Sequence, residues 1–401
     1  MSVRRSFVAR VRSNRSRDVN ADSIQISERQ CVVETIQHVA NELSERRGII
    51  PSHPDQGGAG SASVLSQYHL LGRSGLRVSR LALGTMTFGQ QPWGCDEPTS
   101  AAILDRYLDW GGNLIDTADH YAGGKSERML GEMIAGRGVR DRVVLASKFT
   151  MGSGAKGPNM VGNGRKTMMA SLDASLRRLG TDYIDLYILH VWDGVTPAEE
   201  VMRALDDAVR AGKVRYVALS DVTGWYAARA QTLAEWRGYA PVCALQLEYS
   251  LIERGLELEF PSLCDELGMG LLAWAPLCNG LLSGKHRPGE LSEGRVKTVA
   301  ESGRFDRLTE RNWAILAELD CVAAALGRPM AQVAVNWVAS RPAIGSVILG
   351  ATRPQQLDDT LGALDFTIPA ELLADLDRVS ALPKIFPYRF LEKMQPMLQP
   401  N

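Results

Sequence analysis

Four polar side chains suited to acid–base chemistry follow the ends of three short apolar segments. One segment ends at Asp116 and the turn after it carries Tyr121, and the next two segments end at Lys148 and at His190. In a parallel barrel, the C-terminal ends of the strands meet at the face that carries the chemistry. The sequence therefore predicts that these four residues form one site.

Together these residues suit the reduction of a carbonyl group. A tyrosine phenol, with a pKa of about 10, is a poor proton donor at neutral pH until its surroundings lower that pKa. The ammonium of Lys148 would lower it from hydrogen-bond distance, and Asp116 would hold that ammonium charged and oriented. His190 could polarise or orient the carbonyl. Tyr121 would then protonate the alkoxide as hydride reaches the carbonyl carbon.

Each of these residues also has a structural interpretation when it is taken alone. Asp116 could end a strand or cap a helix, and Tyr121 could be a half-buried loop aromatic. Lys148 could be solvated and His190 could be a core histidine. Their joint occurrence at strand ends favours the catalytic interpretation.

Short apolar segments alternate with helical patterns from residue 80 onward. Eight strands are expected, over residues 80–86, 113–118, 143–147, 185–189, 214–220, 244–248, 270–275 and 345–350. Helices are expected over residues 99–110, 126–134, 167–179, 197–211, 226–236, 257–267, 309–326, 329–340, 355–361 and 369–380.

Eight successive β–α steps favour an α/β fold with a closed parallel sheet, the (β/α)8 TIM barrel. The competing open, doubly wound sheet usually has a glycine-rich dinucleotide turn after its first strand. Here the first strand runs into Gly-Thr-Met-Thr-Phe-Gly (residues 84–89), which lacks the G-x-G-x-x-G spacing. An N-terminal β-hairpin is expected where residues 68–71 and 76–78 flank Gly-Arg-Ser-Gly, and helices are expected at the C-terminal end.

Three regions are expected along the chain. Residues 1–66 are expected to be a poorly ordered N-terminal extension, residues 67–385 the barrel, and residues 386–401 a C-terminal tail. Within the extension, residues 31–46 could form one amphipathic helix and residues 51–63 resemble a flexible linker. We hypothesise that residues 1–65 are dispensable for activity, because the barrel pattern begins after them. Loss of soluble, active protein on their removal would contradict this.

Composition gives few restrictions on function. The 401 residues are 45% hydrophobic and 23% charged with a net charge of -1, so no global charge calls for nucleic acid or a membrane. No apolar run reaches the roughly 18–20 residues of a membrane span. The six cysteines are scattered, which suits reduced thiols in the cytoplasm, and no H-E-x-x-H or Cys/His cluster predicts a metal.

The start of the chain is basic. Residues 1–17 hold six arginines and no acid, and the rest of the chain then has 39 basic and 46 acidic residues. An organelle transit peptide, a disordered tail and a start codon placed too far upstream are the alternatives for this segment.

Several motifs in order resemble the aldo-keto reductase family. Residues 112–121 (Gly-Asn-Leu-Ile-Asp-Thr-Ala-Asp-His-Tyr) with the following Gly124, Ser-Glu and Leu-Gly are similar to its first signature. Residues 146–148 are similar to its lysine strand, 182–193 to its histidine segment, and 246–251 and 275–285 to two cofactor segments. The resemblance covers about residues 68–382. It implies a (β/α)8 barrel, a nicotinamide cofactor and carbonyl reduction. The branch resembled includes aryl-alcohol dehydrogenases and potassium-channel β-subunit-like proteins.

The resemblance also implies roles for individual residues. Asp116, Tyr121, Lys148 and His190 match the catalytic tetrad, and Tyr249 matches an aromatic stacked on the nicotinamide. Arg353 would bind the 2′-phosphate, because a guanidinium fork suits phosphate, which favours NADP(H). The expected cofactor contacts are Gly84, Thr85, Met86, Asp116, Ser220, Asp221, Gln246, Tyr249, Ala275, Pro276, Leu277, Gly280, Leu282, Lys285, Arg304, Gly350, Thr352, Arg353, Gln356, Asp359 and Thr360. Asp221 and Thr360 depart from the family, which often has Asn at both positions.

The loops after the strands are expected to select the substrate. Phe88, Trp93, Trp192 and Trp225 follow strand ends, and an aromatic rim suits an apolar or aryl aldehyde, although such residues are also common packing anchors. Residues 281–308 could be a mobile lid in which Arg304 touches phosphate, or a plain exposed loop.

Three functions therefore compete. The first is an NADP(H)-dependent reductase of a small carbonyl substrate, without nucleic acid or membrane as partner and with an oligomer possible. The second is an NADP(H)-binding regulatory or redox-sensing subunit with slow turnover. The third is a barrel enzyme without nicotinamide, which would need the five cofactor segments to match by accident.

Overall fold

The computed structural model describes residues 65–154, 157–303 and 306–398. They belong to one compact unit that spans residues 62–401. The helix expected over residues 31–46 and the linker expected over residues 51–63 lie outside the described residues, as does Arg304.

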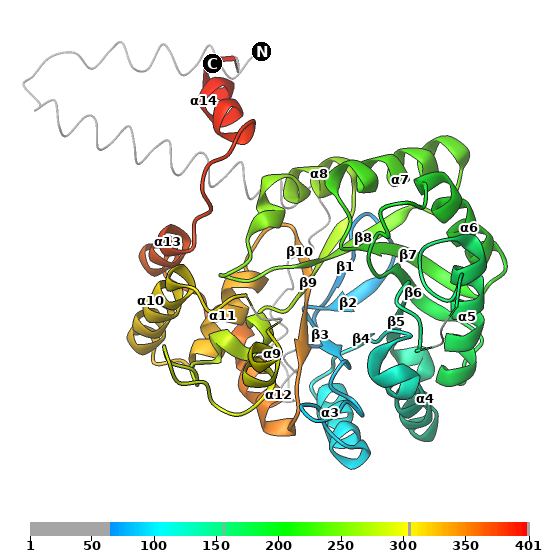
Figure 1. The fold of residues 1–401 in the computed structure, drawn as a ribbon, viewed down its shortest axis with the longest axis horizontal. Coiled ribbons are helices and arrows are strands. Elements are labelled where there is room, and N and C mark those ends of the chain that lie inside the picture. Colours follow the sequence, from blue (N-terminus) through cyan, green and yellow to red (C-terminus); the bar gives the residue numbers. More distant parts are fainter. Residues whose placement is uncertain (1–64, 155–156, 304–305, 399–401) are drawn as a thin grey trace, which may run out of the picture. The chain divides into compact units, whose positions relative to one another are not determined.

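Eight parallel strands close into a barrel, as the sequence predicts (Figure 1). Each strand pairs with the next along the chain, and the last strand returns to pair with the first. This is the (β/α)8 architecture, and the open-sheet alternative is wrong. The strands are β3 (Leu81–Gly84), β4 (Leu114–Asp116), β5 (Val144–Phe149), β6 (Ile184–Leu189), β7 (Val214–Ser220), β8 (Val242–Glu248), β9 (Gly270–Trp274) and β10 (Ile344–Gly350).

Most of the helices pack around the barrel, because each of these has an apolar stripe to bury against the sheet. In α6 (Ala198–Arg210), for example, Val201 and Leu205 are buried while the acidic first turn faces solvent. Asp96 caps the first of these helices by accepting a hydrogen bond from the N–H of Thr99. The helices are α3 (Glu97–Asp109), α4 (Lys125–Arg137), α5 (Arg165–Leu179), α6 (Ala198–Arg210), α7 (Gly224–Arg237), α8 (Phe260–Leu267), α9 (Arg295–Glu301), α10 (Glu310–Leu326), α11 (Met330–Ala339), α12 (Pro354–Leu361), α13 (Ala370–Val379) and α14 (Tyr388–Leu398).

A hairpin of β1 (Tyr68–Leu70) and β2 (Arg77–Ser79) closes the end of the barrel opposite the strand C-termini. Its Leu71, Leu76 and Val78 pack among residues of the barrel interior. A glycine is required at position 72, because a Cβ there would lie 2.6 Å from the carbonyl oxygens of Cys243 and Gly268. Because the hairpin closes this end, a ligand site can open only at the other end of the barrel, where the strands have their C-termini.

The core has two layers with different positions. The inner cluster fills the barrel with small and branched side chains such as Ala82, Ala146 and Ile188. The larger outer cluster lies between the strands and the helices and includes Phe149, Tyr187 and Trp337. Strand residues therefore alternate between the two layers.

The segment expected to be a lid is not a plain loop. It begins within the kinked 3-10 helix η4 (Cys278–Ser283) and contains helix α9, whose Val296 is buried. No side chain caps α9, so its sequence has no start signal, and burial of Val296 stabilises it instead.

At the C-terminal end, α14 has no buried residue, and the region expected to be a tail is helical there.

Candidate active site

The structure brings the four residues of the expected tetrad to one end of the barrel. Asp116 ends β4 and Lys148 lies on the neighbouring strand β5, while His190 directly follows β6. The side chain of Lys148 is fully buried. Its Nζ donates hydrogen bonds to Oδ2 of Asp116 at 2.6 Å, to the carbonyl of Thr117 at 2.9 Å and to the hydroxyl of Tyr121 at 3.2 Å.

A strained turn presents Tyr121 to this lysine. Ala122, Gly123 and Gly124 follow it with φ angles of 49°, 64° and 84°. Two glycines adopt this left-handed backbone without penalty, whereas Ala122 is strained. The turn η1 (Tyr121–Gly124) leads directly into α4, which anchors it. The phenol is therefore held by backbone geometry as well as by its hydrogen bond.

The charges of this pair differ in part from the expectation. Burial raises the pKa of Tyr121 above its usual value, and the ammonium of Lys148 offsets this only in part. The expected net lowering of the tyrosine pKa is therefore wrong for these surroundings. Burial by itself would lower the pKa of Lys148, but Asp116 and Tyr121 raise it overall, so the ammonium form is favoured.

His190 stands beside the phenol as a neutral imidazole. The two rings lie 5.9 Å apart at an angle of 79°. Burial, followed by the charge of Lys148, lowers the pKa of His190 to about 2. Its Nδ1 is buried without a hydrogen-bond partner among the described residues. A histidine in this state can donate or accept a hydrogen bond but does not act as a cation at neutral pH.

Buried polar groups continue the site along β7 and β8. Ser220 lies opposite Gln246 in the register, and Nε2 of Gln246 donates to Oδ1 of Asp116 at 2.9 Å. The hydroxyl of Ser220 is buried without a partner among the described residues. A buried polar group without a protein partner usually binds a water, an ion or a ligand. These two residues could therefore hold a polar ligand such as a carboxamide.

Asp221 has an unusual backbone and an aromatic partner. Its φ is 47°, and its Oδ1 accepts a 3.1 Å hydrogen bond from Nε1 of Trp274. Burial raises the pKa of its carboxyl to about 6. Trp274 ends β9, remains partly exposed and packs on the inner cluster. Its ring thus belongs to the wall of the site.

The expectation for Tyr249 is wrong. This side chain lies in the outer core, where it is 2% exposed and packs 5.3 Å from the ring of Trp337. Its hydroxyl donates to Glu257. It lies beyond the end of β8, so the turn and not the strand pleat sets its direction. Sequence reasoning missed Trp274, although an aromatic as the last residue of an apolar strand was available as a signal.

The end of β3 supplies further expected contacts. Gly84 and Thr85 are buried, and the hydroxyl of Thr85 donates to the carbonyl of Asp116. Met86 is partly exposed, and its sulfur lies 3.7 Å from Nη2 of Arg295. These contacts join β3 to the lid segment.

Arg295 on α9 was not expected. Its guanidinium lies 4.8 Å from the ring centroid of Trp93 and has no carboxylate partner among the described residues. Burial lowers the pKa of the Arg295 guanidinium. The largest effect that raises this pKa is the electrostatic interaction with the phenol of Tyr121. A partly buried cation without an anion beside the site could hold a phosphate. No helix was expected here, which is why sequence reasoning missed it.

The loop after β9 carries more strained residues. Cys278 and Asn279 have φ angles of 45° and 59°, and such strain clusters at ligand sites. Leu282 is fully buried, so only its backbone could touch a phosphate, whereas Lys285 is exposed. The other expected contacts on this loop are Ala275, Pro276, Leu277 and Gly280.

The segment expected to meet the adenosine end begins at the exposed Gly350 and continues into α12. Oε1 of Gln356 accepts hydrogen bonds from the N–H and hydroxyl of Thr352. Arg353 and Asp359 are exposed. Thr360 is 9% exposed and its hydroxyl donates to carbonyls of its own helix, so the expected contact of this side chain with adenine is not supported.

The expected aromatic rim is only partly present. Trp192 and Trp225 pack edge to face with centroids 5.2 Å apart, and Trp225 is 57% exposed. Trp93 lies against Arg295. Phe88 is fully buried in the outer core, so it cannot line a substrate pocket as expected.

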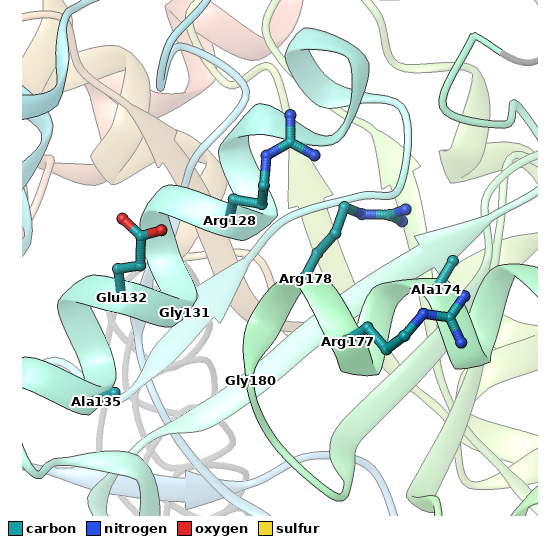
Figure 2. Close-up of a pocket in the computed structure, with 8 residues that line it drawn as sticks. All are labelled: Arg128, Gly131, Glu132, Ala135, Ala174, Arg177, Arg178 and Gly180. Atoms are coloured by element: carbon teal, nitrogen blue, oxygen red, sulfur yellow. The ribbon is translucent and has the colours of Figure 1, made fainter.

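A separate groove of about 510 Å³ lies outside the barrel, between α4 and α5, and has no tetrad residue in its lining (Figure 2). Figure 2 shows Arg128 and Glu132 on α4 and Arg177 and Arg178 on α5. The helices approach closely at Gly131, where a Cβ would lie 2.5 Å from the carbonyl oxygen of Leu179.

The described residues hold neither a cluster of metal ligands nor a membrane-spanning helix. They contain no group of three or more His, Cys, Asp or Glu side chains placed to hold a metal ion. None of the helices described is both long and apolar enough to span a bilayer.

Residues 80–381 match the model of the Aldo/keto reductase family. The chain is 37% identical to the uncharacterized oxidoreductase YrpG of Bacillus subtilis, over 78% of this chain and 95% of that protein. It is 32% identical to the aryl-alcohol dehydrogenase GME11368 of Pestalotiopsis microspora, over 82% and 86%. It is 34% identical to a probable voltage-gated potassium channel subunit beta of Oryza sativa subsp. japonica, over 80% and 98%.

Proposed function

Since the chain belongs to the aldo/keto reductase family, we propose that this oxidoreductase reduces aldehydes or ketones to alcohols with NADP(H), with Tyr121 as the general acid. One observation carries this proposal. The buried ammonium of Lys148 joins the carboxylate of Asp116 to the hydroxyl of Tyr121, at 2.6 and 3.2 Å. A proton donor is thereby fixed at the end of the barrel where the substrate loops gather.

The residues present fit a nicotinamide cofactor. The hydroxyl of Ser220, which has no hydrogen-bond partner among the residues that the structure describes, suits its carboxamide. The guanidinium of Arg295, which has no carboxylate partner there, suits its pyrophosphate. Trp274, on the wall of the site, offers a ring face to the nicotinamide. When bound, the cofactor supplies the hydride.

The chain's own residues handle the proton. Lys148 holds the phenol of Tyr121 in place and favours its anion once the proton has gone to the substrate oxygen. His190, neutral at every physiological pH, orients the carbonyl oxygen toward that phenol. Asp116 accepts hydrogen bonds from Lys148 and from Gln246, and it thereby keeps the lysine ammonium in place beside Tyr121.

The preference for NADP(H) rests on Arg353. Its side chain is exposed at the N-cap of α12, where the helix dipole also favours an anion. A 2′-phosphate could thus meet both a guanidinium and a helix N-terminus.

Aryl aldehydes are the substrates we propose to test first. The exposed Trp225, with Trp192 beside it, offers an aromatic surface near the end of β6 and β7. One relative is named an aryl-alcohol dehydrogenase, which agrees with this choice.

A regulatory role is the second candidate. The relative named a probable potassium channel subunit beta is matched over 98% of its length, so its whole domain has a counterpart in this chain. Under this alternative the protein would bind NADP(H) and turn over slowly.

One titration separates the two candidates. Purified protein is titrated with NADPH, and a panel of aryl and short aliphatic aldehydes is then added while nicotinamide absorbance is followed. We expect turnover that disappears in Tyr121→Phe while NADPH binding is kept. Tight binding with negligible turnover would favour the regulatory role, and no binding would contradict both.

A further inference from the structure

A second pair of titratable side chains lies directly beside the tetrad. Asp119 and His120 sit between Asp116 and Tyr121, in the turn that follows β4. The backbone N–H of Asp119 donates to the carbonyl of Lys148, which fixes the turn against β5. Neither residue has a part in the mechanism above.

The carboxyl of Asp119 is enclosed and lacks hydrogen bonds. Its side chain is 2% exposed, and neither oxygen has a partner among the described residues. Ser171 and the N–H of Gly152 approach it without hydrogen-bond geometry. A buried carboxyl without partners is costly, and such groups usually serve a purpose.

The charges around Asp119 disfavour its ionised form. Glu127 of α4 is fully buried nearby and is paired with Arg178 of α5 at 2.6 Å and with Ser147 of β5 at 2.5 Å. The guanidinium of Arg178 is thus already paired with Glu127. Burial and then the charge of Glu127 raise the pKa of Asp119 to about 7. The carboxyl therefore carries a proton over much of the range below neutral pH.

His120 lies between this carboxyl and the reacting groups. Its Nδ1 is 3.9 Å from Oδ1 of Asp119. Its ring centroid is 4.8 Å from that of Tyr121 and 4.9 Å from that of His190, so the three rings form a triangle. Nδ1 is buried, and 27% of the side chain is exposed, which leaves the Nε2 edge accessible.

We propose that Asp119 and His120 act as a pair that donates a hydrogen bond from Nε2 of His120 to a second oxygen of the substrate, on the carbon next to the reacting carbonyl. The inference rests on the proposed reductase function and names a substrate class for it, carbonyl compounds with a vicinal hydroxyl or keto oxygen. Asp119 is the positioning residue and His120 contacts the substrate.

Proton placement supports this division of roles. A protonated Asp119 donates its O–H to Nδ1, which leaves the ring proton on Nε2 as a donor toward the pocket. Burial, followed by the charge of Lys148, lowers the pKa of His120 to about 4, so the ring itself remains neutral. The 3.9 Å gap must shorten for this bond to form, and catalytic hydrogen bonds often tighten only when substrate is bound.

The geometry explains why the second oxygen must be vicinal. In the proposed mechanism Tyr121 and His190 contact the substrate oxygen that is reduced. The ring of His120 packs against both of their rings. Its donor therefore lies where it can reach an atom close to that oxygen. A keto or hydroxyl oxygen on the neighbouring carbon satisfies this distance.

The test compares propanal with 2-hydroxypropanal, which share a carbon skeleton and differ by the vicinal oxygen. With NADPH, wild type is expected to show a kcat/KM preference for the hydroxylated aldehyde. In His120→Phe that preference falls roughly tenfold, the worth of one hydrogen bond, while kcat/KM for propanal stays within about twofold. Equal losses for both substrates would overturn the inference.

Two variants separate positioning by Asp119 from a structural role. Asp119→Asn keeps an N–H that can donate to Nδ1, whereas Asp119→Leu keeps the volume without a donor. We expect Asn to retain the preference and Leu to lose it, with NADPH binding intact in both. Loss in both variants, or in neither, would refute the role of Asp119.

The outcomes also distinguish this inference from the proposed function. Tyr121-dependent turnover of propanal without any preference for 2-hydroxypropanal in wild type would leave the reductase in place and refute the pair. Turnover of the aryl aldehydes but of neither of these two would refute the inference alone. Absence of turnover with the whole panel would refute the proposed function, and the inference with it.

Discussion

The side-chain amide of Gln246 donates a 2.9 Å hydrogen bond to Oδ1 of Asp116, a residue 130 positions earlier in the chain. This bond crosses the barrel from β8 to β4. With Lys148 on Oδ2, it leaves both carboxylate oxygens of Asp116 satisfied. The tetrad is therefore supported from β8 by Gln246, which is itself one of the expected cofactor contacts.

Replacing Gln246 with Leu should destabilise the fold. The change leaves Oδ1 of the buried Asp116 without its donor, and an unsatisfied buried acceptor costs about 1–3 kcal/mol. Urea denaturation measures the free energy of unfolding. Gln355→Leu is the control, because Gln355 is exposed and should change stability by less than about 0.5 kcal/mol. Equal effects of the two substitutions would contradict the importance of this bond.

Lys148→Met should abolish turnover and lower the free energy of unfolding by about 3–5 kcal/mol, because it leaves a buried carboxylate without its cation. Adding Asp116→Asn should restore much of the stability and none of the activity, since the amide needs no counter-charge. Thermal or urea unfolding of both variants, beside an aldehyde assay, checks this. A double variant as unstable as the single one would mean that Lys148 acts mainly through packing.

Much of the fold follows from the sequence for a physical reason. A barrel strand buried on both faces is a short apolar run bounded by turns, and the runs ending at Asp116 and Lys148 are of that kind. Polar residues at the ends of such runs must converge once the barrel closes. The grouping of Asp116, Tyr121, Lys148 and His190 was predictable on that basis.

Side-chain direction beyond a strand end was not predictable in the same way. Tyr249 follows β8, and the turn there points it outward to Trp337. Arg295 lies on a helix that depends on tertiary burial of Val296, which leaves no local signal. The enclosure of Asp119 depends on Glu127 and Arg178, which reach it from two helices. Each of these misses concerns contacts between elements, about which periodicity says nothing.

Arg353→Ala should weaken NADPH binding roughly tenfold or more and leave NADH binding within about twofold, because only NADPH has a 2′-phosphate to lose a charged hydrogen bond. The side chain is exposed, so the free energy of unfolding should not change. Fluorescence titration with both cofactors measures the two dissociation constants. Arg237→Ala, also at an exposed position, is the control. Equal weakening for both cofactors would place the 2′-phosphate elsewhere.

His190→Leu should flatten the dependence of stability on pH below neutrality. The pKa of His190 is about 2 in the folded chain, against an ordinary value of 6.5. As pH falls below about 6.5 the unfolded chain takes up a proton that the folded chain refuses, so wild type loses up to about 1.4 kcal/mol per pH unit from this group. Asp119 opposes this, because its raised pKa of about 7 stabilises the folded chain as pH falls, but it does so equally in both proteins. Urea unfolding at pH 8, 6.5, 6, 5.5 and 5 measures the difference between them. At pH 8 neither state holds the proton, so the offset there reports packing alone. A wild-type curve parallel to that of the variant from pH 8 to 5 would mean that His190 is protonated in the folded protein, and it would remove the neutral imidazole from the proposed mechanism.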